Sequence, residues 1–171
     1  MLSNSTEQRN LFSNNKLPLG LLVDTNNIAF RAKHSIRHST EDKIIFSFHL
    51  MLSSLLYCSK KFDFSYVAFF LDGKSWRYDF YKNYRIGRRI QNHLKSKDEK
   101  EDDKKFLEGI NKFSDFLRTK TNVPVLMSPR LEADDLISCW IKMFPQHNFI
   151  ILSSDSDFQQ LISENTILYD I

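Results

Sequence analysis

Three carboxylates stand close together where an apolar helical pattern begins. The stretch RLEADDLI (130–137) holds Glu132, Asp134 and Asp135, followed by apolar residues at helical spacing. Like charges three residues apart on a helix repel each other, by roughly 0.2–0.5 kcal/mol per exposed pair. Acids in the first turn of a helix are also favoured by the helix dipole, by about 0.3–1 kcal/mol each. The stretch alone is therefore open to two interpretations, a stabilised helix start and a site for cations.

Four further aspartates stand at or just beyond the ends of apolar runs that have the composition of buried strands. Asp24 ends LPLGLLVD, Asp72 ends SYVAFFLD, and Asp155 ends HNFIILSSD, with Asp157 two residues later. Three of them have a local alternative: an Asx-turn at Asp24, a plain Asp-Gly turn at Asp72 and a capping box at Asp157. Because ligands bind beyond the carboxyl ends of the strands in an open parallel sheet, we expect all seven carboxylates to converge on one edge.

Short apolar runs alternate with amphipathic stretches along the chain after residue 16. Strands are expected at 17–24, 65–72, 123–127 and 147–155, and a short fifth run at 166–169 is a candidate strand. Helices are expected at 28–36, at 42–62, through Phe106, Ile110, Phe113 and Leu117, at 132–144 and at 158–163, with a turn at 25–27. This alternation predicts an α/β domain over 17–171, with a mostly parallel, twisted sheet in a three-layer α/β/α arrangement. Residues 1–16 are interpreted as a mobile polar lead.

Seven acids on one edge require either strongly raised pKa values or a compensating cation. No histidine or cysteine accompanies them, so the donor set is all oxygen, which favours Mg²⁺, with Mn²⁺ as a substitute. Two such ions about 3.5–4 Å apart are typical of phosphoryl-transfer sites. A structural Ca²⁺ site would more often take its ligands from one continuous loop. The candidate metal ligands are Asp24, Asp72, Glu132, Asp134, Asp135, Asp155 and Asp157.

A basic segment lies between the second and third expected strands. Residues 74–97 hold eight Lys or Arg and one acid, a net charge of +7, and the whole chain carries +3, so the remainder carries −4. Within WRYDFYKNYRIGRR, Trp76 and Tyr84 offer stacking faces worth roughly 1–3 kcal/mol per base. A solvated, Arg-rich helix face is the alternative. The insertion is long for a simple crossover, and such insertions are often lids or binding loops. Beside an acidic metal edge, the basic segment indicates a polyanionic substrate.

The lengths of the apolar runs and the placement of the cysteines indicate where in the cell the protein is located. No apolar run approaches the roughly 18 residues of a membrane span, so no membrane partner is expected. Cys58 and Cys139 lie in apolar helical patterns without metal-ligand spacing, which predicts buried, reduced thiols and a cytoplasmic location. The charged run KSKDEKEDDKK is interpreted as a solvated helix or loop rather than a site.

Four motifs together resemble the catalytic, PIN-like domain of the 5′-nuclease family, which includes flap endonucleases, the 5′–3′ exonucleases attached to bacterial DNA polymerases, and phage RNase H. They are VDTNNIAFRAKH, FFLDGKSWRYDFYKNYRIGR, RLEADDLI and ILSSDSDFQQL. Their order and spacing are similar to the family's, and they cover nearly everything after residue 17. EADD with SSDSDFQQL is a specific pair, whereas DTNN alone would be weak. The phage branch is the most similar, given WRYDF followed by YRIGR.

The resemblance implies a role for each acid. Asp72, Asp134 and Asp135 would surround a first metal, with Glu132 bound to it directly or through water. Asp155 and Asp157 would reach toward a second metal, and Asp24 would support the cluster.

The resemblance also implies a helical arch at about 74–105 and a set of substrate contacts. Arg31 and Lys33 match basic residues near the scissile phosphate, and Tyr84 matches an aromatic residue at the base of the arch. Arg85 stands where the family usually has an arch lysine, a departure because arginine keeps its proton and has a planar fork; Lys82 would partly substitute. The implied catalytic residues are Arg85, Lys82 and Arg31, and the implied nucleic-acid contacts are Arg31, Lys33, Lys74, Arg77, Lys82, Tyr84, Arg85, Arg88 and Arg89.

The function implied is a metal-dependent 5′–3′ exonuclease or flap endonuclease, with RNase H-like primer removal. Its substrate would be DNA or an RNA–DNA hybrid with a 5′ end or flap, in the host cytoplasm if the chain is phage-encoded. Family members continue with two more aspartates and a helix–three-turn–helix element, which do not follow here. The alternatives are a split nuclease completed by a separate chain, a one-metal nuclease, a binding domain without turnover, and a PIN-type ribonuclease.

Overall fold

The computed structural model describes residue 12, residues 17–35 and residues 40–170. It contains five strands, β1 (Leu19–Asp24), β2 (Tyr66–Leu71), β3 (Val125–Met127), β4 (Asn148–Leu152) and β5 (Thr166–Tyr169). The helices are α1 (Thr25–Ser35), α2 (Thr40–Lys61), α3 (Arg77–Phe80), α4 (Ile86–Leu94), α5 (Lys97–Lys120), α6 (Ala133–Met143) and the 3₁₀ helix η2 (Ser156–Leu161).

The five strands form one parallel sheet in the order β3-β2-β1-β4-β5. β1 is the central strand, and the pairing of its last residues fixes where the ends of β2 and β4 lie relative to it. Asp24 pairs with Phe70 of β2, two residues before Asp72, and Val23 pairs with Leu152 of β4. The carboxyl ends of three strands are therefore adjacent, and the predicted α/β architecture with a parallel sheet is confirmed.

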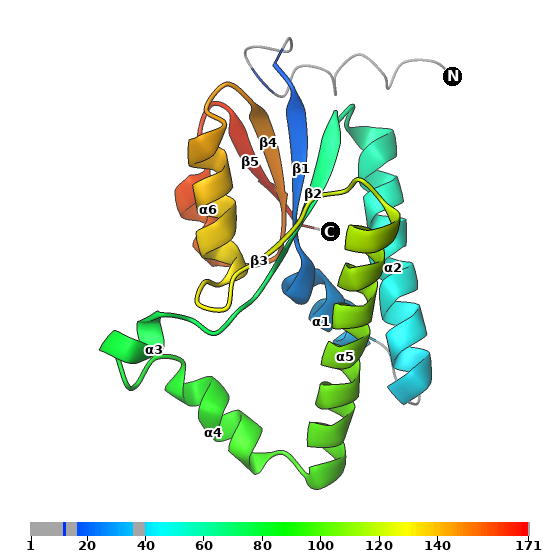
Figure 1. Ribbon diagram of the computed structural model, residues 1–171, viewed down its shortest axis with the longest axis vertical. Helices are drawn as coiled ribbons and strands as arrows, with labels where there is room; N and C mark the ends of the chain where they lie inside the picture. Colours follow the sequence, from blue (N-terminus) through cyan, green and yellow to red (C-terminus); the bar gives the residue numbers. More distant parts are fainter. Residues whose placement is uncertain (1–11, 13–16, 36–39, 171) are drawn as a thin grey trace.

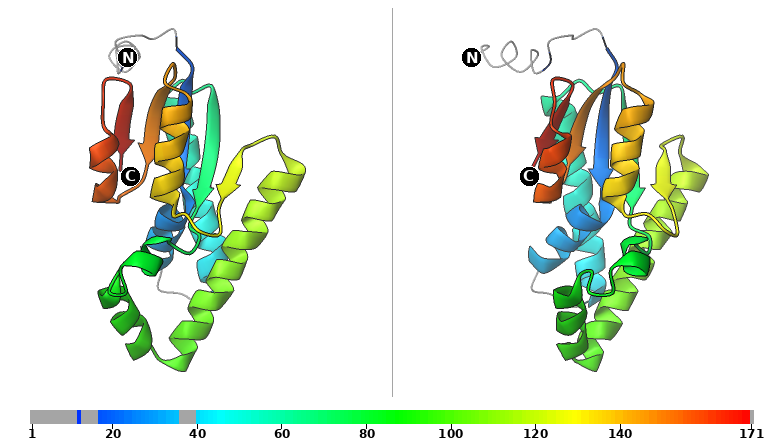
Figure 2. Two further views of the ribbon diagram at one scale, coloured as in Figure 1. Left: turned by 60° about the vertical axis from the view of Figure 1, so that its left-hand side comes forward. Right: turned by 90° about the vertical axis from the view of Figure 1, so that its left-hand side faces the viewer.

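Helices cover both faces of the sheet (Figure 1). Alternate residues of a strand point to opposite faces, so Leu21 and Val23 of β1 pack into one core with α2 and α5. Leu22, between them, packs into a second core with Ile137 of α6. In Figure 1, α1, α2 and α5 lie on one side and α6 on the other, and the two views in Figure 2 agree.

The charged run at the start of α5 is helical, one of the two forms expected for it. Ser96 and Glu99 form a capping box: the Glu99 N–H donates to Ser96 Oγ at 3.1 Å, and the Ser96 N–H donates to Glu99 Oε2 at 2.8 Å. Further along, Phe106 and Ile110 are buried against the α1 side of the sheet. α5 is thus a 24-residue helix whose first turns project beyond the sheet.

The segment between β2 and α5 leaves the sheet, forms α3 and α4, and returns to the start of α5. Figures 1 and 2 show it beyond the carboxyl ends of the strands, with α4 approaching the projecting end of α5. α3 and α4 bury no residue completely. This segment is the part expected to form an arch, and its limits at 74 and 105 stay a prediction.

Two local predictions are wrong. The turn expected at 25–27 is the first turn of α1, because the Asp24 side chain accepts a hydrogen bond from the Asn27 N–H at 3.3 Å and so caps the helix directly after β1. Cys139 is exposed, whereas Cys58 is buried as expected. α6 buries the face of Ile137, and a residue two positions later lies about 200° around the helix.

Other boundaries differ by a few residues, and β4 ends at Leu152, three residues before Asp155. The expected mobile lead at 1–16 lies outside the described residues except for Phe12, which is buried in the core beside α2. Among the described residues, no helix combines the length and the apolarity needed to cross a membrane.

Candidate active site

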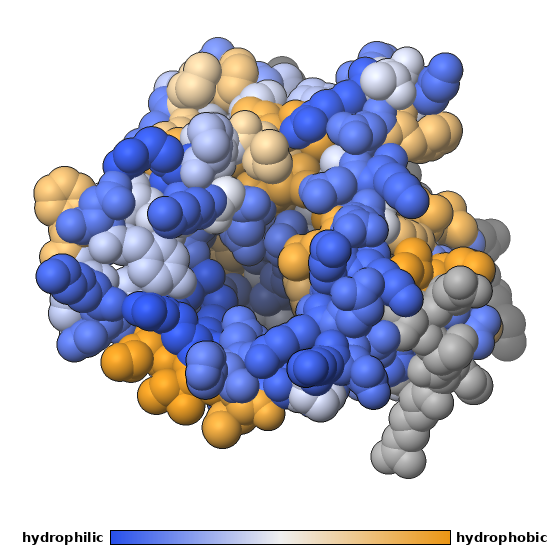
Figure 3. Space-filling model, turned by 60° about the horizontal axis from the view of Figure 1, so that its bottom comes forward, coloured by the Kyte–Doolittle hydropathy of each residue, from blue (hydrophilic) through white to orange (hydrophobic). Residues whose placement is uncertain are grey.

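A cavity of about 490 Å³ opens at the carboxyl ends of the strands. Figure 3 looks onto this side of the molecule, where hydrophilic side chains surround a central hollow. Five of the seven predicted acids line the cavity: Asp24, Asp72, Glu132, Asp134 and Asp155. Asp135 and Asp157 are not among the lining residues.

Asp24 is the most enclosed aspartate of this group, at 6% exposed. Its carboxylate accepts hydrogen bonds from Ser153 Oγ at 2.9 Å and from the Asn27 N–H. Burial, and then the nearby charge of Asp72, raise the pKa of Asp24 to about 7, from an ordinary 3.8. The fold therefore holds a carboxylate where a negative charge is poorly compensated.

Asp72 is bound to the start of α6. Its Oδ1 accepts a hydrogen bond from the Ala133 N–H at 2.9 Å. Asp72 is reached by solvent but lies within the cavity. Its partial removal from water there raises the pKa of the carboxyl group. Burial likewise raises the pKa of Asp134, whose Oδ1 accepts a hydrogen bond from the Asp135 N–H at 2.7 Å.

Glu132 is almost fully buried and is held by three side chains. Arg85 Nη1 lies 2.6 Å from Oε1, and Arg77 Nη1 donates to Oε2 at 2.9 Å. The Tyr84 hydroxyl also donates to Oε2, at 2.7 Å. Arg77 in addition forms a two-pronged pair with Asp135, at 2.9 and 3.0 Å, which holds Asp135 away from the cavity.

The acids of RLEADDLI thus have a cation among them, and it is a side chain. Oxygens of Glu132, Asp134 and Asp135 lie within 4.8 Å of one another, and Arg77 Nη2 is 3.6 Å from Asp134 Oδ2. Asp135 also accepts a hydrogen bond from the Glu132 N–H at 3.1 Å, which stabilises the start of α6. Both interpretations of this stretch therefore describe part of the site.

The remaining acids of the cavity fit a divalent cation. None of the ion pairs within 4 Å among the described residues involves Asp24, Asp72 or Asp155. Asp155 Oδ1 accepts the Asp157 N–H at 3.0 Å, which fixes its orientation at the start of η2. Carboxylates that line one cavity without a bound arginine offer the oxygen donors that Mg²⁺ and Mn²⁺ prefer.

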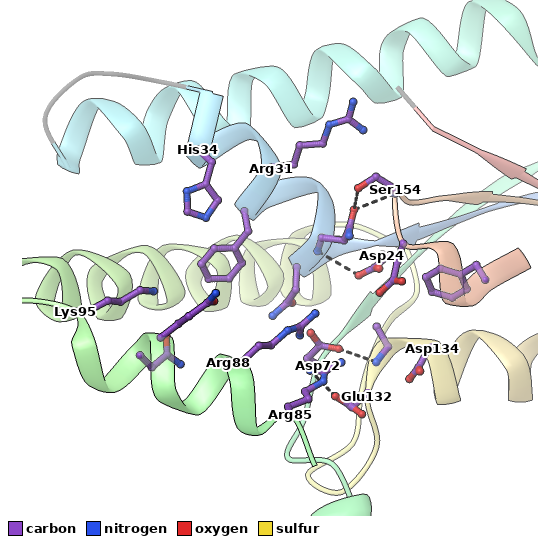
Figure 4. Close-up of a pocket in the computed structure, with 18 residues that line it drawn as sticks. Asp24, Arg31, His34, Asp72, Arg85, Arg88, Lys95, Glu132, Asp134 and Ser154 are labelled. Atoms are coloured by element: carbon purple, nitrogen blue, oxygen red, sulfur yellow. Dashed lines mark hydrogen bonds and ion pairs between the residues drawn. The ribbon is translucent and has the colours of Figure 1, made fainter. Parts of the chain in front are cut away.

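The opposite part of the cavity is basic and polar. Of the predicted substrate contacts, Arg31, Arg85 and Arg88 line the cavity, and Arg85 lies on its acidic side, bound to Glu132. In Figure 4, Asp24, Asp72, Glu132 and Asp134 gather at one side, Arg31, His34 and Lys95 lie at the other, and Arg88 lies between them. Arg31 forms an exposed ion pair with Asp170.

The other predicted contacts lie elsewhere. Lys33 is 7% exposed in its side chain and pairs with Asp103, so its ammonium group is already bound. Lys74, Lys82 and Arg89 are exposed outside the cavity lining. Their roles in binding stay predictions.

Seven polar lining residues were not predicted, namely Asn26, Asn27, His34, Gln91, Asn92, Lys95 and Ser154. For the residues on or next to α4, the sequence spacing could have indicated that they share one face of a helix. Once α4 is recognised, positions 85, 88, 92 and 95 fall on one helical face, since residues three and four apart are neighbours. His34 stands three residues after Arg31 on α1 in the same way.

Arg85 has a left-handed backbone conformation, with φ 52° and ψ 34°. It is the one non-glycine residue with positive φ in the described parts of the chain. This conformation costs roughly 1–2 kcal/mol for a residue with a Cβ. It turns the chain into α4 and places the Arg85 guanidinium on Glu132, so the arginine is held where local backbone preference opposes it.

The fold is similar to that of solved phage T5 structures. The T5 protein co-crystallised with metal ions matches with a TM-score of 0.71 and 19% identity, over 90% of this chain and 54% of that one. T5 5′-exonuclease with divalent zinc ions matches at 0.72 and 20%, over 90% and 55%. The T5 flap endonuclease in a pseudo-enzyme-product complex with DNA and metal ions matches at 0.70 and 19%, over 90% and 55%.

At this identity the likeness shows the fold, and the chain spans about half the length of these structures. No curated protein matches it. The sequence itself carries the assignment. Residues 20–171, which include every carboxylate of the cavity, match the family described as 5′-3′ exonuclease, N-terminal resolvase-like domain, and the chain therefore belongs to that family.

Proposed function

We propose that this domain is the catalytic part of a divalent-metal-dependent 5′ nuclease, which hydrolyses phosphodiesters near the 5′ ends of DNA or RNA–DNA hybrids. One observation carries the proposal. One cavity is lined by five carboxylates and also by the cationic side chains of Arg31, Arg85, Arg88 and Lys95, of which Arg31 and Lys95 lie across from the acids. Phosphodiester hydrolysis needs both, because the basic wall attracts the polyanion that the acids alone would repel.

The metal is held by the acids of the cavity. Asp24, Asp72, Asp134 and Asp155 are the proposed ligands for Mg²⁺, with Mn²⁺ as a substitute and two ions in the complete site. When bound, such ions supply Lewis-acid stabilisation of phosphoryl charge and activate water. Glu132 acts beside them, fixed by Arg85, while Asp135 and Asp157 orient their neighbours.

The substrate's phosphates contact the basic wall. Arg31, Arg88 and Lys95 line the cavity, although Arg31 is paired with Asp170 and Lys95 with Asp103, and Arg85 brings a guanidinium to the edge of the acidic cluster. Arginine suits this task because its planar fork binds two phosphate oxygens at once. The segment 74–105 is the proposed arch over the strand that is cut, with Lys74, Lys82 and Arg89 on its outer surface.

Partners and location complete the proposal. One similar structure is a flap endonuclease complex with DNA and metal ions, which supports DNA as a ligand here; an RNA–DNA hybrid is the second substrate we propose. A separate chain that contributes to the site is also proposed as a partner. A cytoplasmic location is supported by two free cysteines in the described residues.

The test is a cleavage assay with four labelled substrates: a 5′-flap, a blunt duplex, an RNA–DNA hybrid and single-stranded RNA. Each is incubated with Mg²⁺, Mn²⁺ or EDTA. We expect metal-dependent cutting of the flap or hybrid, abolished by Asp134→Ala and unchanged by Asp115→Ala, whose side chain is 72% exposed on α5. No metal-dependent cutting of either substrate contradicts the proposal.

A second function, nucleic-acid binding without turnover, is favoured by the arginines on Glu132. Arg77 and Arg85 neutralise that carboxylate within the chain itself. Tight binding of the flap substrate in EDTA and in Mg²⁺, with no product in either, would support this alternative. Cutting restricted to single-stranded RNA would instead indicate a PIN-type ribonuclease.

A further inference from the structure

The part of α4 that lines the cavity carries two uncharged amides between two cations. Gln91 and Asn92 line the cavity together with Arg88 and Lys95. Each amide stands three or four residues from each cation, so the four side chains share one face of the helix and its end. In Figure 4, Arg88 lies beside Asp72 and Lys95 lies far from the acids. A strand that leaves the acidic cluster along α4 therefore reaches the amides next.

Both amides are free to bind a ligand. Gln91 and Asn92 are exposed, and neither side chain forms a hydrogen bond with another residue in the described parts of the chain. Each amide has a nitrogen that donates two hydrogen bonds and an oxygen that accepts two. The pair thus presents donors and acceptors together to the cavity.

A sugar–phosphate backbone does not account for both halves of these amides. Phosphate oxygens only accept hydrogen bonds, so they use the amide nitrogens and leave the amide oxygens to water. The edge of a nucleobase presents donors and acceptors side by side, and an Asn or Gln amide matches adenine with two parallel hydrogen bonds. Unpaired bases offer such edges to side chains. The chemistry that complements the amides is therefore that of an unpaired base.

Positive charge remains on both sides of the amides. Arg88 takes part in none of the ion pairs within 4 Å among the described residues. Lys95 shares the carboxylate of Asp103 with Lys33, so two ammonium groups face one carboxylate and a net charge of +1 is left. A strand whose base lies at the amides has phosphates on either side of that base, and these cations attract them.

α1 supplies ring surfaces across the cavity from α4. Phe30 lines the cavity, and its ring packs against that of Phe106, with 5.2 Å between the centroids. The His34 ring, 6.4 Å from that of Phe30, lies on the same side in Figure 4. The space between the two helices thus has rings on one side and amides on the other, which suits a planar base.

We propose that Gln91 and Asn92 hydrogen-bond the edge of an unpaired base of the substrate strand, beyond the acidic cluster, and give the domain a base preference. The inference rests on the proposed function, because its ligand is the strand that the cavity is proposed to hold. Adenine is the preferred base, since its edge matches a side-chain amide with two hydrogen bonds.

The test is a cycle of binding measurements on protein and substrate, by fluorescence anisotropy in EDTA, where no metal-dependent cutting competes. A labelled 5′-flap DNA carries one abasic site, moved in turn through the nucleotides next to the flap junction. At one position, loss of the base should weaken binding to the wild type about tenfold, because its hydrogen bonds to the amides are lost. The double variant Gln91→Ala with Asn92→Ala should bind the intact and the abasic flap equally. Adenine at that position should bind the wild type most tightly.

Asn111→Ala is the matched control, because Asn111 is an exposed asparagine of α5 outside the cavity lining. It should respond to the abasic site as the wild type does. Circular dichroism checks that the variants are folded, which is expected because alanine favours a helix.

Three results overturn the inference. If the wild type binds every abasic flap as tightly as the intact one, the amides read no base, and the proposed function still stands. If an RNA flap binds more tightly than the DNA flap through the amides, without any effect of the base, their ligand is a ribose hydroxyl. A chain that binds no flap in EDTA or in Mg²⁺ removes the inference together with the proposed function.

Discussion

Lys33 on α1, which is buried, forms an ion pair with the partly buried Asp103 on α5, with Lys33 Nζ 2.5 Å from Asp103 Oδ1. The other oxygen of Asp103 lies 2.6 Å from Lys95 Nζ, just beyond α4. Burial alone would raise the pKa of Asp103, but the two ammonium groups lower it. One carboxylate thus joins α1, α5 and the end of α4, and it positions the wall of the cavity that carries Lys95.

Removing Asp103 should destabilise the domain. Asp103→Ala leaves the Lys33 ammonium buried without its partner, which should cost about 2–4 kcal/mol in the free energy of unfolding. Replacing both residues, as in Lys33→Met with Asp103→Leu, removes the buried charge and should recover most of that loss. Urea denaturation of the two variants and the wild type measures the difference. Equal stability of Asp103→Ala and wild type would show that the pair is not buried.

Asp24→Asn should change the pH dependence of stability when EDTA removes metals. The raised pKa of Asp24, about 7, means that the folded state prefers the neutral acid. Its contribution to stability is fully present below about pH 4 and is lost as the pH rises through 7. Asparagine cannot ionise, so the variant should be more stable than wild type at pH 8, by about 2–4 kcal/mol, since each tenfold change in proton affinity is worth about 1.4 kcal/mol.

The comparison at low pH provides the control for Asp24→Asn. Below pH 4 both proteins carry a neutral group at this position, so their unfolding free energies should converge. If the variant is less stable than the wild type at pH 8, the negative charge of Asp24 is stabilised in the folded state, which contradicts a raised pKa. Saturating Mg²⁺ at pH 8 should stabilise the wild type more than the variant, because only the wild type keeps the charge.

The strands, and the sheet edge at which they end, could be predicted because each strand is a continuous run of apolar residues in the sequence. Runs such as LLV in β1 and FIIL in β4 are apolar throughout, as strands buried on both faces must be. Once the sheet is parallel, register brings Asp24, Asp72 and Asp155 to one edge without knowledge of any side-chain contact. Five of the seven predicted acids therefore line the cavity.

Charge pairing was not predictable, because it depends on tertiary placement. Arg77 was expected to bind phosphates, and no sequence spacing shows that it lies between Glu132 and Asp135, more than 50 residues away. Lys33 follows Arg31 by two residues, about 200° around the helix, so one side chain reaches the cavity and the other is buried. The exposed Cys139 has the same origin, because apolar composition does not say which helix face meets the core.

Arg77→Gln should weaken the metal-free protein and increase its response to metal. Glu132 and Asp135 both lose charge-assisted hydrogen bonds, which should cost about 2–4 kcal/mol in EDTA. Magnesium should then raise the melting temperature of the variant more than that of the wild type, because the freed carboxylates gain a cation. Arg130→Gln is the control: its exposed pair with Asp79 should change stability by under about 0.5 kcal/mol. An unchanged magnesium response would mean that Arg77 does not compete for the acids.

At position 85, glycine should give a more stable protein than alanine, the reverse of the usual order within a helix. Both substitutions remove the guanidinium from Glu132, so the two variants differ only in backbone preference. Because φ is 52° there, Arg85→Gly should be more stable than Arg85→Ala by about 1 kcal/mol. At Arg88, inside α4, the order should reverse by a similar amount, about 1 kcal/mol. Thermal denaturation of the four variants measures both differences, and the same order at both positions would contradict the left-handed conformation.

Gly73 stands directly after Asp72, where the chain passes close to the loop that precedes α6. A Cβ at this position would lie 1.8 Å from the backbone oxygen of Ser128 and 2.9 Å from that of Leu131. The Gly73 N–H donates to the same Leu131 oxygen at 2.8 Å, so the backbone cannot retreat without losing that bond. Gly73→Ala should therefore displace the end of β2 together with Asp72, and lower both the melting temperature and the affinity for Mg²⁺.

Gly87 supplies the matched control for Gly73. An added Cβ at this helical position meets no atom within 4 Å, so Gly87→Ala should stabilise α4 by about 0.5–1 kcal/mol through helix propensity alone. Calorimetric titration with Mg²⁺ and thermal denaturation of both variants separate a local effect on the acidic edge from a general effect of adding a methyl group. If Gly73→Ala binds Mg²⁺ as Gly87→Ala does, Asp72 is not a ligand, because a clash of this size cannot leave the adjacent carboxylate in place.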